Sequence, residues 1–205
     1  MVIPAISVVL ALAQSSALPA LNYVPDPRIP MPTPWRQPGY LQIWWIQSPN
    51  YNARPVGTVV DTVVVHSTVI PTLERTTAAF QRTSSAVSAH FTIDKDGSIV
   101  QNVSTFDRAW HAGVSRDAEG RTNLNNTSIG IELVNLNDGV DPYPEAQLMA
   151  LCGIIAQMKR RFYLKQIVSH EYIAQPPGRK SDPRNFPWKR LEYLGLPIFT
   201  GQSKP

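Results

Sequence analysis

Runs of β-branched and other apolar residues divide the middle of the chain into predicted strands. Thr58–Val65 (TVVDTVVV) is such a run, ends at His66, and is typical of a strand buried on both faces. Ser128–Asn135 (SIGIELVN) and Ile167–His170 (IVSH) predict two more strands. Phe91–Val103 predicts a hairpin, because a Lys-Asp-Gly turn interrupts it. The pattern therefore predicts a β-sheet.

Two segments between these strands show helical spacing. Thr72–Thr83 predicts one helix, and Pro144–Tyr163 predicts a longer one with an acidic start and a basic end, which suits the helix dipole. The single cysteine, Cys152, lies within this apolar pattern and is expected to be a buried side chain; one cysteine allows no intrachain disulfide. Because strands and helices alternate, we predict an α/β fold with a mixed sheet. The apolar positions of the longer helix are Leu148, Leu151, Ile155, Met158 and Phe162.

The first quarter of the chain is rich in proline. Nine of the nineteen prolines fall between Pro19 and Pro55, so residues 18–55 are predicted to form an extended arm and residues 56–205 the folded domain. A free linker rarely carries many aromatic residues, so we expect part of the arm to pack on the domain. These aromatic residues are Trp35, Tyr40, Trp44 and Trp45.

Residues 1–17 have the features of a signal peptide. Val2–Ala13 is apolar apart from Ser7, and the small residues ending at Ala17 suit cleavage. We therefore expect a periplasmic or secreted protein. The usual positive start is missing, since the first basic residue is Arg28, and a cytoplasmic location is the alternative. No apolar run reaches the length of about eighteen residues that a membrane helix needs, so no transmembrane span is expected.

The net charge of +4 favours an anionic partner, such as nucleic acid, a membrane surface or a bacterial wall, although a basic solvated surface has the same charge. No basic helix or nucleic-acid motif accompanies it, so we expect no nucleic-acid partner. The HExxH pattern of zincin peptidases and the GxSxG pattern of serine hydrolases are both absent.

Of the four histidines, His66 and His170 end apolar strands. A histidine there either points into a cleft or is a core residue bonded to a carbonyl, and for one histidine alone the core role is favoured. After His170, the segment GRKSDP places Lys180 and Asp182 on one side if it is extended. Two imidazoles and one carboxylate suit a catalytic zinc site with an open position. A surface Lys-Asp pair is the alternative.

Glu132 is the remaining candidate for chemistry. It interrupts the apolar strand with a carboxylate, which is costly to bury without a partner. A solvated strand face is the alternative, but apolar residues on both sides make that less favourable.

Taken together, residues 48–190 resemble the type 2 N-acetylmuramoyl-L-alanine amidases, relatives of peptidoglycan recognition proteins and of amidase-type phage lysozymes. Each matching motif is weak alone, but all of them occur in the family's order. The motifs are SPNYNARP (48–55), DTVVVHST (61–68), SAHFTIDKDGSIVQ (88–101), AWHAG (109–113), NNTSIGIELVN (125–135), VSHEYI (168–173), PGRKSDP (177–183) and FPW (186–188).

The resemblance implies a central mixed sheet flanked by helices, with zinc in a groove on one face. It implies that His66, His170 and Asp182 bind Zn²⁺, that Glu132 is the general base, and that Lys180 stabilises the oxyanion. The implied reaction is hydrolysis of the amide between N-acetylmuramic acid and the L-alanine of the peptidoglycan stem peptide. We expect a monomer acting on peptidoglycan or muropeptides.

The resemblance also indicates substrate contacts and a substrate class. His111 is expected to line the groove, Trp110 to stack on sugar or fill the core, and Asn126 to contact the stem peptide. The presence of glutamate at position 132 makes the chain resemble the bacterial amidases that act on muropeptides and 1,6-anhydro-muropeptides. The alternative function is a non-catalytic peptidoglycan-binding module, as in relatives that have lost a zinc ligand. This chain keeps all three ligands, which favours the enzyme.

Two features depart from the family pattern. The segment from His170 to Asp182 is about two residues longer than usual, near 174–176, which affects the expected place of Lys180. Ala89 stands where recognition proteins and phage lysozymes more often have tyrosine, so Glu132 must act as the base if the chain is active. Neither departure removes a candidate ligand.

The apolar start predicts a processing event. If residues 1–17 are a signal peptide, the mature protein should begin near Leu18. Amino-terminal sequencing of the secreted or periplasmic form measures this. An intact Met1 on protein recovered from the cytoplasm would contradict the prediction.

Overall fold

The computed structural model describes residues 43–201, so the predicted signal peptide and most of the predicted arm lie outside the described residues. Ile43–Trp45, from the end of the predicted arm, forms strand β1 and pairs with β5 at the edge of the main sheet. Among the described residues, no helix is both long and apolar enough to cross a membrane.

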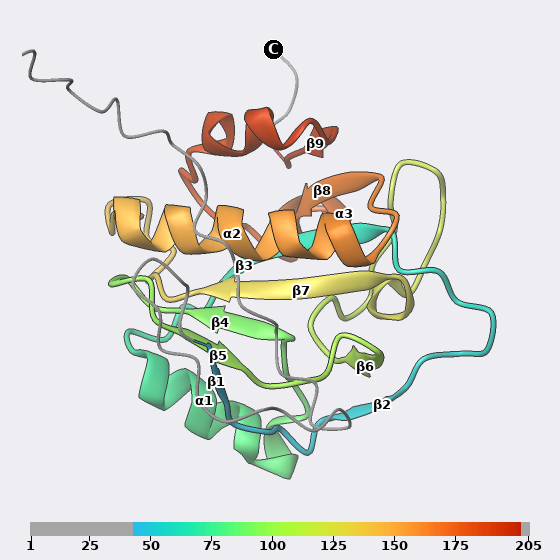
Figure 1. Cartoon of the computed structure of the whole chain (residues 1–205), viewed down its shortest axis with the longest axis horizontal. Helices are drawn as coiled ribbons and strands as arrows, with labels where there is room; N and C mark the ends of the chain where they lie inside the picture. Colours follow the sequence, from blue (N-terminus) through green and yellow to red (C-terminus); the bar gives the residue numbers. More distant parts are fainter. Residues whose placement is uncertain (1–42, 202–205) are drawn as a thin grey trace, which may run out of the picture.

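A seven-stranded mixed sheet forms the centre of the fold, in the order β1-β5-β4-β7-β3-β8-β9 (Figure 1). Strands β4, β7, β3, β8 and β9 run parallel, while β5 is antiparallel to β4 in the predicted hairpin. The expected mixed sheet is confirmed. The strands are β1 (Ile43–Trp45), β3 (Thr62–Ser67), β4 (Phe91–Ile93), β5 (Ile99–Gln101), β7 (Ser128–Leu133), β8 (Gln166–Ser169) and β9 (Ile198–Phe199).

Helix α2 (Glu145–Arg161) covers one face of the sheet. Its apolar residues pack with alternate residues of β3 and β7, such as Val63, Val65 and Ile131, in the largest core cluster. Cys152 is buried in this cluster, as expected. Because side chains alternate along a strand, Val64, His66 and Glu132 belong to the opposite face.

The opposite face is covered by shorter elements. Helix α1 (Leu73–Gln81) begins after Thr72, whose hydroxyl accepts a hydrogen bond from the Arg75 amide, and it packs Leu73 against Val100 and Val134. A two-stranded sheet of β2 (Tyr51–Ala53) and β6 (Asp107–Ala109) precedes the AWHAG motif. The remaining helices are α3 (His170–Ile173) and the 3₁₀ turns η1 (Thr83–Ser85), η2 (Leu124–Asn126) and η3 (Trp188–Leu194).

Several predicted boundaries were wrong. The strand expected at Thr58–Val65 begins at Thr62 and ends at Ser67. Its start is later than predicted because Val59 is exposed and the Asp61 amide donates to the Thr127 carbonyl, outside the strand pairing. His170 was predicted to end a strand, but it begins α3, where the Ser169 hydroxyl caps the helix by accepting from the Tyr172 amide. Both helices are also slightly shorter than predicted.

Candidate metal centre and active site

The two candidate histidine ligands are brought together by parallel strand pairing. His66 lies near the carboxyl end of β3, and His170 directly follows β8, its neighbour in the sheet. Val65 is paired with Ser169 in the register, so the next residue of each strand is a histidine. Their ring centroids are 4.4 Å apart. The carboxyl edge of a parallel sheet thus supplies two imidazoles side by side.

Asp182 reaches the same place from the loop after α3. Its Oδ2 lies 3.0 Å from His170 Nδ1 and 3.5 Å from His66 Nδ1. One potential ligand atom from each residue lies within 4.8 Å of the other two, and all three residues are buried. The loop is anchored beside His170, because the Glu171 amide donates to the Asp182 carbonyl at 2.9 Å. The sequence-predicted ligands therefore form one compact cluster.

The electrostatics of this cluster follow from burial. Desolvation, together with the neighbouring His170, lowers the pKa of His66 to about 4, so its imidazole is neutral near neutral pH. Burial raises the pKa of Asp182, but its hydrogen bond with His170 and the nearby His66 ring outweigh that effect and hold the pKa well below its usual range. A neutral imidazole and an ionised carboxylate are the protonation states that a metal ligand needs.

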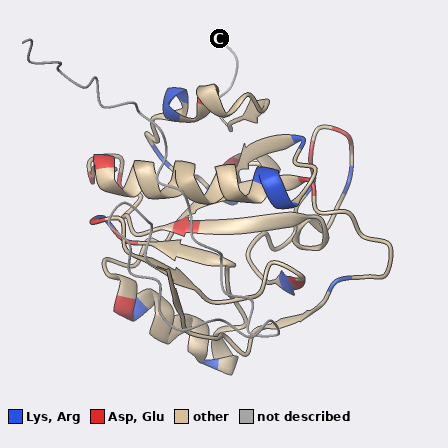
Figure 2. Ribbon diagram, viewed as in Figure 1, with Lys and Arg blue, Asp and Glu red and all other residues tan. Residues whose placement is uncertain are grey.

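Glu132 lies beside His66 on the same face of the sheet, since β3 and β7 pair these two residues directly. It is the single Asp, Glu, Lys or Arg residue in the seven strands of the main sheet, where β7 carries the acidic segment (Figure 2). Its Oε2 is buried and has no hydrogen-bond partner among the described residues. Desolvation and the nearby Asp182 raise its pKa to about 8, against a lowering effect of Lys180.

Lys180 is exposed, and it affects the pKa values of two residues of the site. Its charge lowers the pKa of both His66 and Glu132, so its ammonium group lies close enough to act on the cluster. Lys180 therefore adds positive charge near the buried cluster.

Comparison with known proteins agrees with this geometry. The family model described as N-acetylmuramoyl-L-alanine amidase (Amidase_2) matches residues 56–185. The chain belongs to the N-acetylmuramoyl-L-alanine amidase family. It is 35% identical over 174 residues to the 1,6-anhydro-N-acetylmuramyl-L-alanine amidase AmpD of Citrobacter freundii, covering 74% of this chain and 89% of that protein.

The matches to two further relatives span a smaller share of those proteins. AmpD of Haemophilus influenzae is 42% identical over 108 residues, which span 51% of this chain and 56% of that protein. A solved complex of the amidase AmiD from E. coli with anhydro-N-acetylmuramic acid-L-Ala-D-γ-Glu-L-Lys has a TM-score of 0.60 and 31% identity, covering 70% of this chain and 61% of AmiD. The fold is therefore that of the type 2 amidases.

Within the amidase fold, the three residues expected to touch substrate occupy different surroundings. Trp110 is partly exposed, and its Nε1 donates to Asn52 Oδ1 at 2.7 Å. The Asn126 side chain accepts from Arg108 Nε at 2.7 Å. His111 is only 8% exposed, and its Nδ1 lies 3.0 Å from His66 Nε2. His111 therefore lies next to the candidate ligand His66, and both of its ring nitrogens face protein atoms.

A partly buried arginine that the sequence analysis did not single out supports this part of the amidase. Arg54 donates through NH1 to the Asn125 and Asn126 carbonyls and through NH2 to the Ser128 carbonyl. Burial lowers its pKa to about 10. The available signal was its place in the SPNYNARP motif, in which Ser48 and Asn50 also donate side-chain hydrogen bonds to the Phe80 carbonyl. Arg54 therefore ties the start of β7 to η2.

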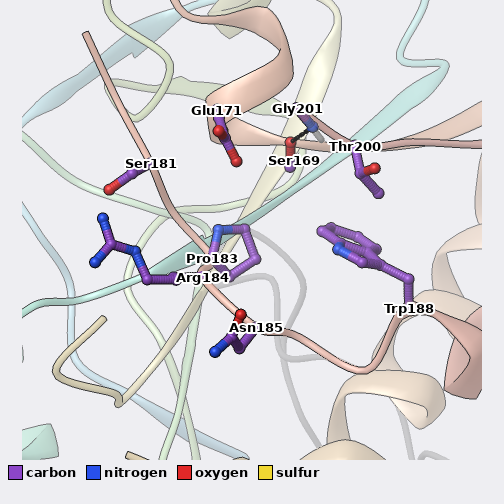
Figure 3. Close-up of a pocket in the computed structure, with 9 residues that line it drawn as sticks. All are labelled: Ser169, Glu171, Ser181, Pro183, Arg184, Asn185, Trp188, Thr200 and Gly201. Atoms are coloured by element: carbon purple, nitrogen blue, oxygen red, sulfur yellow. Dashed lines mark hydrogen bonds between the residues drawn. The ribbon is translucent and has the colours of Figure 1, made fainter. Parts of the chain in front are cut away.

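A separate hollow of about 160 Å³ lies beside the ligand-bearing segments. Ser169 and Glu171, which flank His170, contribute to it together with Ser181 and Pro183, which flank Asp182 (Figure 3). None of the three candidate ligands lines it. Its other lining residues are Arg184, Asn185, Trp188, Thr200 and Gly201.

The raised pKa of Glu132 predicts how the metal-free amidase responds to pH. Between about pH 4.5 and 8 the unfolded carboxyl is ionised while the folded one stays protonated, so folding takes up a proton and stability falls as pH rises. Glu132→Gln removes this penalty. In chelator-treated protein the variant should be as stable as wild type near pH 4.5 and more stable at pH 8, by on the order of a few kcal/mol.

Urea unfolding at a series of pH values measures this difference. Glu74→Gln, at an exposed position of α1, is the matched control and should show no gain that grows across the same range. A constant difference between Glu132→Gln and wild type from pH 4.5 to 8 would show that the buried carboxylate carries no such cost.

Proposed function

We propose that this chain is a zinc-dependent amidase that hydrolyses the bond between N-acetylmuramic acid, including its 1,6-anhydro form, and the L-alanine of the stem peptide. The observation that carries the proposal is the convergence of two imidazole Nδ1 atoms on one Asp182 oxygen, with Glu132 on the same sheet face. The names of the AmpD relatives and the substrate in the AmiD complex support the choice of bond.

The residues fit a zinc ion. Nitrogen atoms of His66 and His170 and an oxygen of Asp182 are the ligand types that zinc prefers, and three protein ligands leave one position open, as in catalytic zinc sites. Without a shared cation, the same cluster leaves an ionised buried carboxylate beside the neutral imidazole of His66. When bound, zinc supplies a Lewis acid that polarises the carbonyl and lowers the pKa of water.

Glu132 and Lys180 supply the remaining chemistry. The Glu132 carboxylate accepts the proton of the attacking water and passes it to the leaving amine of L-alanine. In the metal-free protein its burial next to the cluster raises its pKa to about 8, and a pKa close to the working pH suits a group that both accepts and donates a proton. The Lys180 ammonium adds positive charge where the oxyanion develops.

The finer points of location and partner belong to the same proposal. The apolar run within residues 1–17 supports action in the periplasm or outside the cell, with a cytoplasmic role as the alternative. Peptidoglycan or its released muropeptides are the proposed partner, with a monomer as the working unit.

The proposed bond choice predicts a defined product. Incubation of purified muropeptides with the protein should release a stem peptide that begins with a free L-alanine amine, and a chelator should abolish this release. Mass spectrometry of the products measures it, with 1,6-anhydro and reducing muropeptides compared at equal concentration. Binding without any release would instead favour the alternative, a non-catalytic peptidoglycan-binding module.

The proposed roles predict different results for three variants. Glu132→Gln should keep zinc and lose turnover by roughly a hundred- to ten-thousand-fold, because only the base is removed. Lys180→Ala should also keep zinc and lose mainly turnover. Asp182→Ala should bind zinc far more weakly, because it lacks a ligand.

Zinc content by metal analysis and initial rates on muropeptides check this pattern. If Glu132→Gln lost zinc while Asp182→Ala kept it, the two carboxylates would have each other's roles. Near-wild-type turnover in Glu132→Gln would show that another group is the base.

A further inference from the structure

His111 is bonded through both ring nitrogens. Its Nδ1 lies 3.0 Å from His66 Nε2, and its Nε2 lies 3.2 Å from Ser128 Oγ. Ser128 Oγ in turn donates to the Leu124 carbonyl. All of these side chains are buried. The four groups form a continuous hydrogen-bonded chain that starts at a candidate zinc ligand and ends on the backbone.

The Leu124 carbonyl sets the direction of every proton in this chain. A carbonyl can only accept, so the Ser128 hydroxyl proton is committed to it. Ser128 Oγ then accepts from His111 Nε2–H, which leaves His111 Nδ1 without a proton and able to accept from His66 Nε2–H. A neutral His66 with its proton on Nε2 has a free lone pair on Nδ1, the atom that faces Asp182.

Packing holds the His111 ring in the place that this chain requires. Asn125 Oδ1 accepts from the backbone amides of His111 and Ala112, at 3.0 and 2.7 Å. On the other side the ring lies against Gly130 of β7, where an added Cβ would come 2.4 Å from His111 Cγ. The glycine is therefore needed for the ring to approach the strand so closely.

We propose that His111 is a positioning residue that fixes the tautomer and ring orientation of His66, so that His66 Nδ1 is held ready for the metal. The inference rests on the proposed zinc site and assigns His111 a place behind the metal instead of the substrate contact expected from the sequence. His170 differs, because its Nε2 is buried without a hydrogen-bond partner among the described residues. His66 is thus the candidate ligand that the protein orients through Nε2, the ring nitrogen that does not face the metal site. Loss of a hydrogen-bond partner of this kind weakens metal binding.

Two substitutions of His111 separate hydrogen bonding from packing. In His111→Asn the Oδ1 atom takes the place of Nδ1, so an acceptor for His66 is kept while ring volume is lost. His111→Leu fills more of the volume but offers no acceptor. If the hydrogen bond matters, the asparagine variant keeps zinc affinity and the leucine variant loses it; if packing matters, the order reverses.

The measurement is the zinc dissociation constant of the full chain, by competition with a fluorescent chelator after metal removal. We expect His111→Leu to bind zinc about 10- to 100-fold more weakly than wild type, and His111→Asn to recover most of this loss. Ser128→Ala should also weaken binding, because His111 Nε2 loses its acceptor. Thr62→Val is the matched control, since Thr62 is the buried register partner of Ser128 but lies outside the chain of hydrogen bonds.

The proposal is overturned if His111→Leu binds zinc like wild type, or if His111→Asn binds as weakly as His111→Leu. Failure of wild-type protein to bind zinc would reject the proposed function itself. Thermal unfolding of each metal-free variant identifies any that do not fold. Nitrogen-15 NMR of metal-free wild type gives an independent reading: His111 should carry its proton on Nε2, and a proton on Nδ1 would reject the proposal without any variant.

Discussion

The parallel pairing of β3 with both β7 and β8 is the constraint on which the site depends. This register places His66 directly beside Glu132 on one side and next to His170 on the other. A shift of one residue in either pair would turn a side chain to the α2 face, because the period along a strand is two residues. The apolar residues of β3 and β7 that pack under α2 therefore also align the chemistry on the opposite face.

Bringing these titratable side chains together in the protein interior destabilises the metal-free fold. Two imidazoles and two carboxyl groups share this region, and Glu132 Oε2 has no hydrogen-bond partner within residues 43–201. An unpaired buried polar group destabilises a fold unless something binds to it. A cation shared by His66, His170 and Asp182 would offset part of this cost. The features that weaken the metal-free protein are thus those that favour a bound metal.

The sequence predicted the long regular elements, and the three residues that it proposed as ligands lie together. It failed where information was local or three-dimensional. Thr62–Ser67, Ser128–Leu133 and the hairpin carry strong apolar patterns, so they were predictable. Strands β2 and β6 have three residues each, too few for any periodicity to show. The position of His111 behind His66 could not be predicted, because its neighbours His66 and Ser128 are 45 and 17 residues away.

One face of β7 then explains why the SIGIEL segment has its composition. Ser128, Gly130 and Glu132 alternate with isoleucines and a leucine that lie under α2, so all three share the face of the site. Ser128 bonds His111, Gly130 makes room for the His111 ring, and Glu132 lies beside His66. A side chain at Gly130 would collide with the His111 ring and displace it. The smallest residue of the strand is therefore as much a part of the site as its carboxylate.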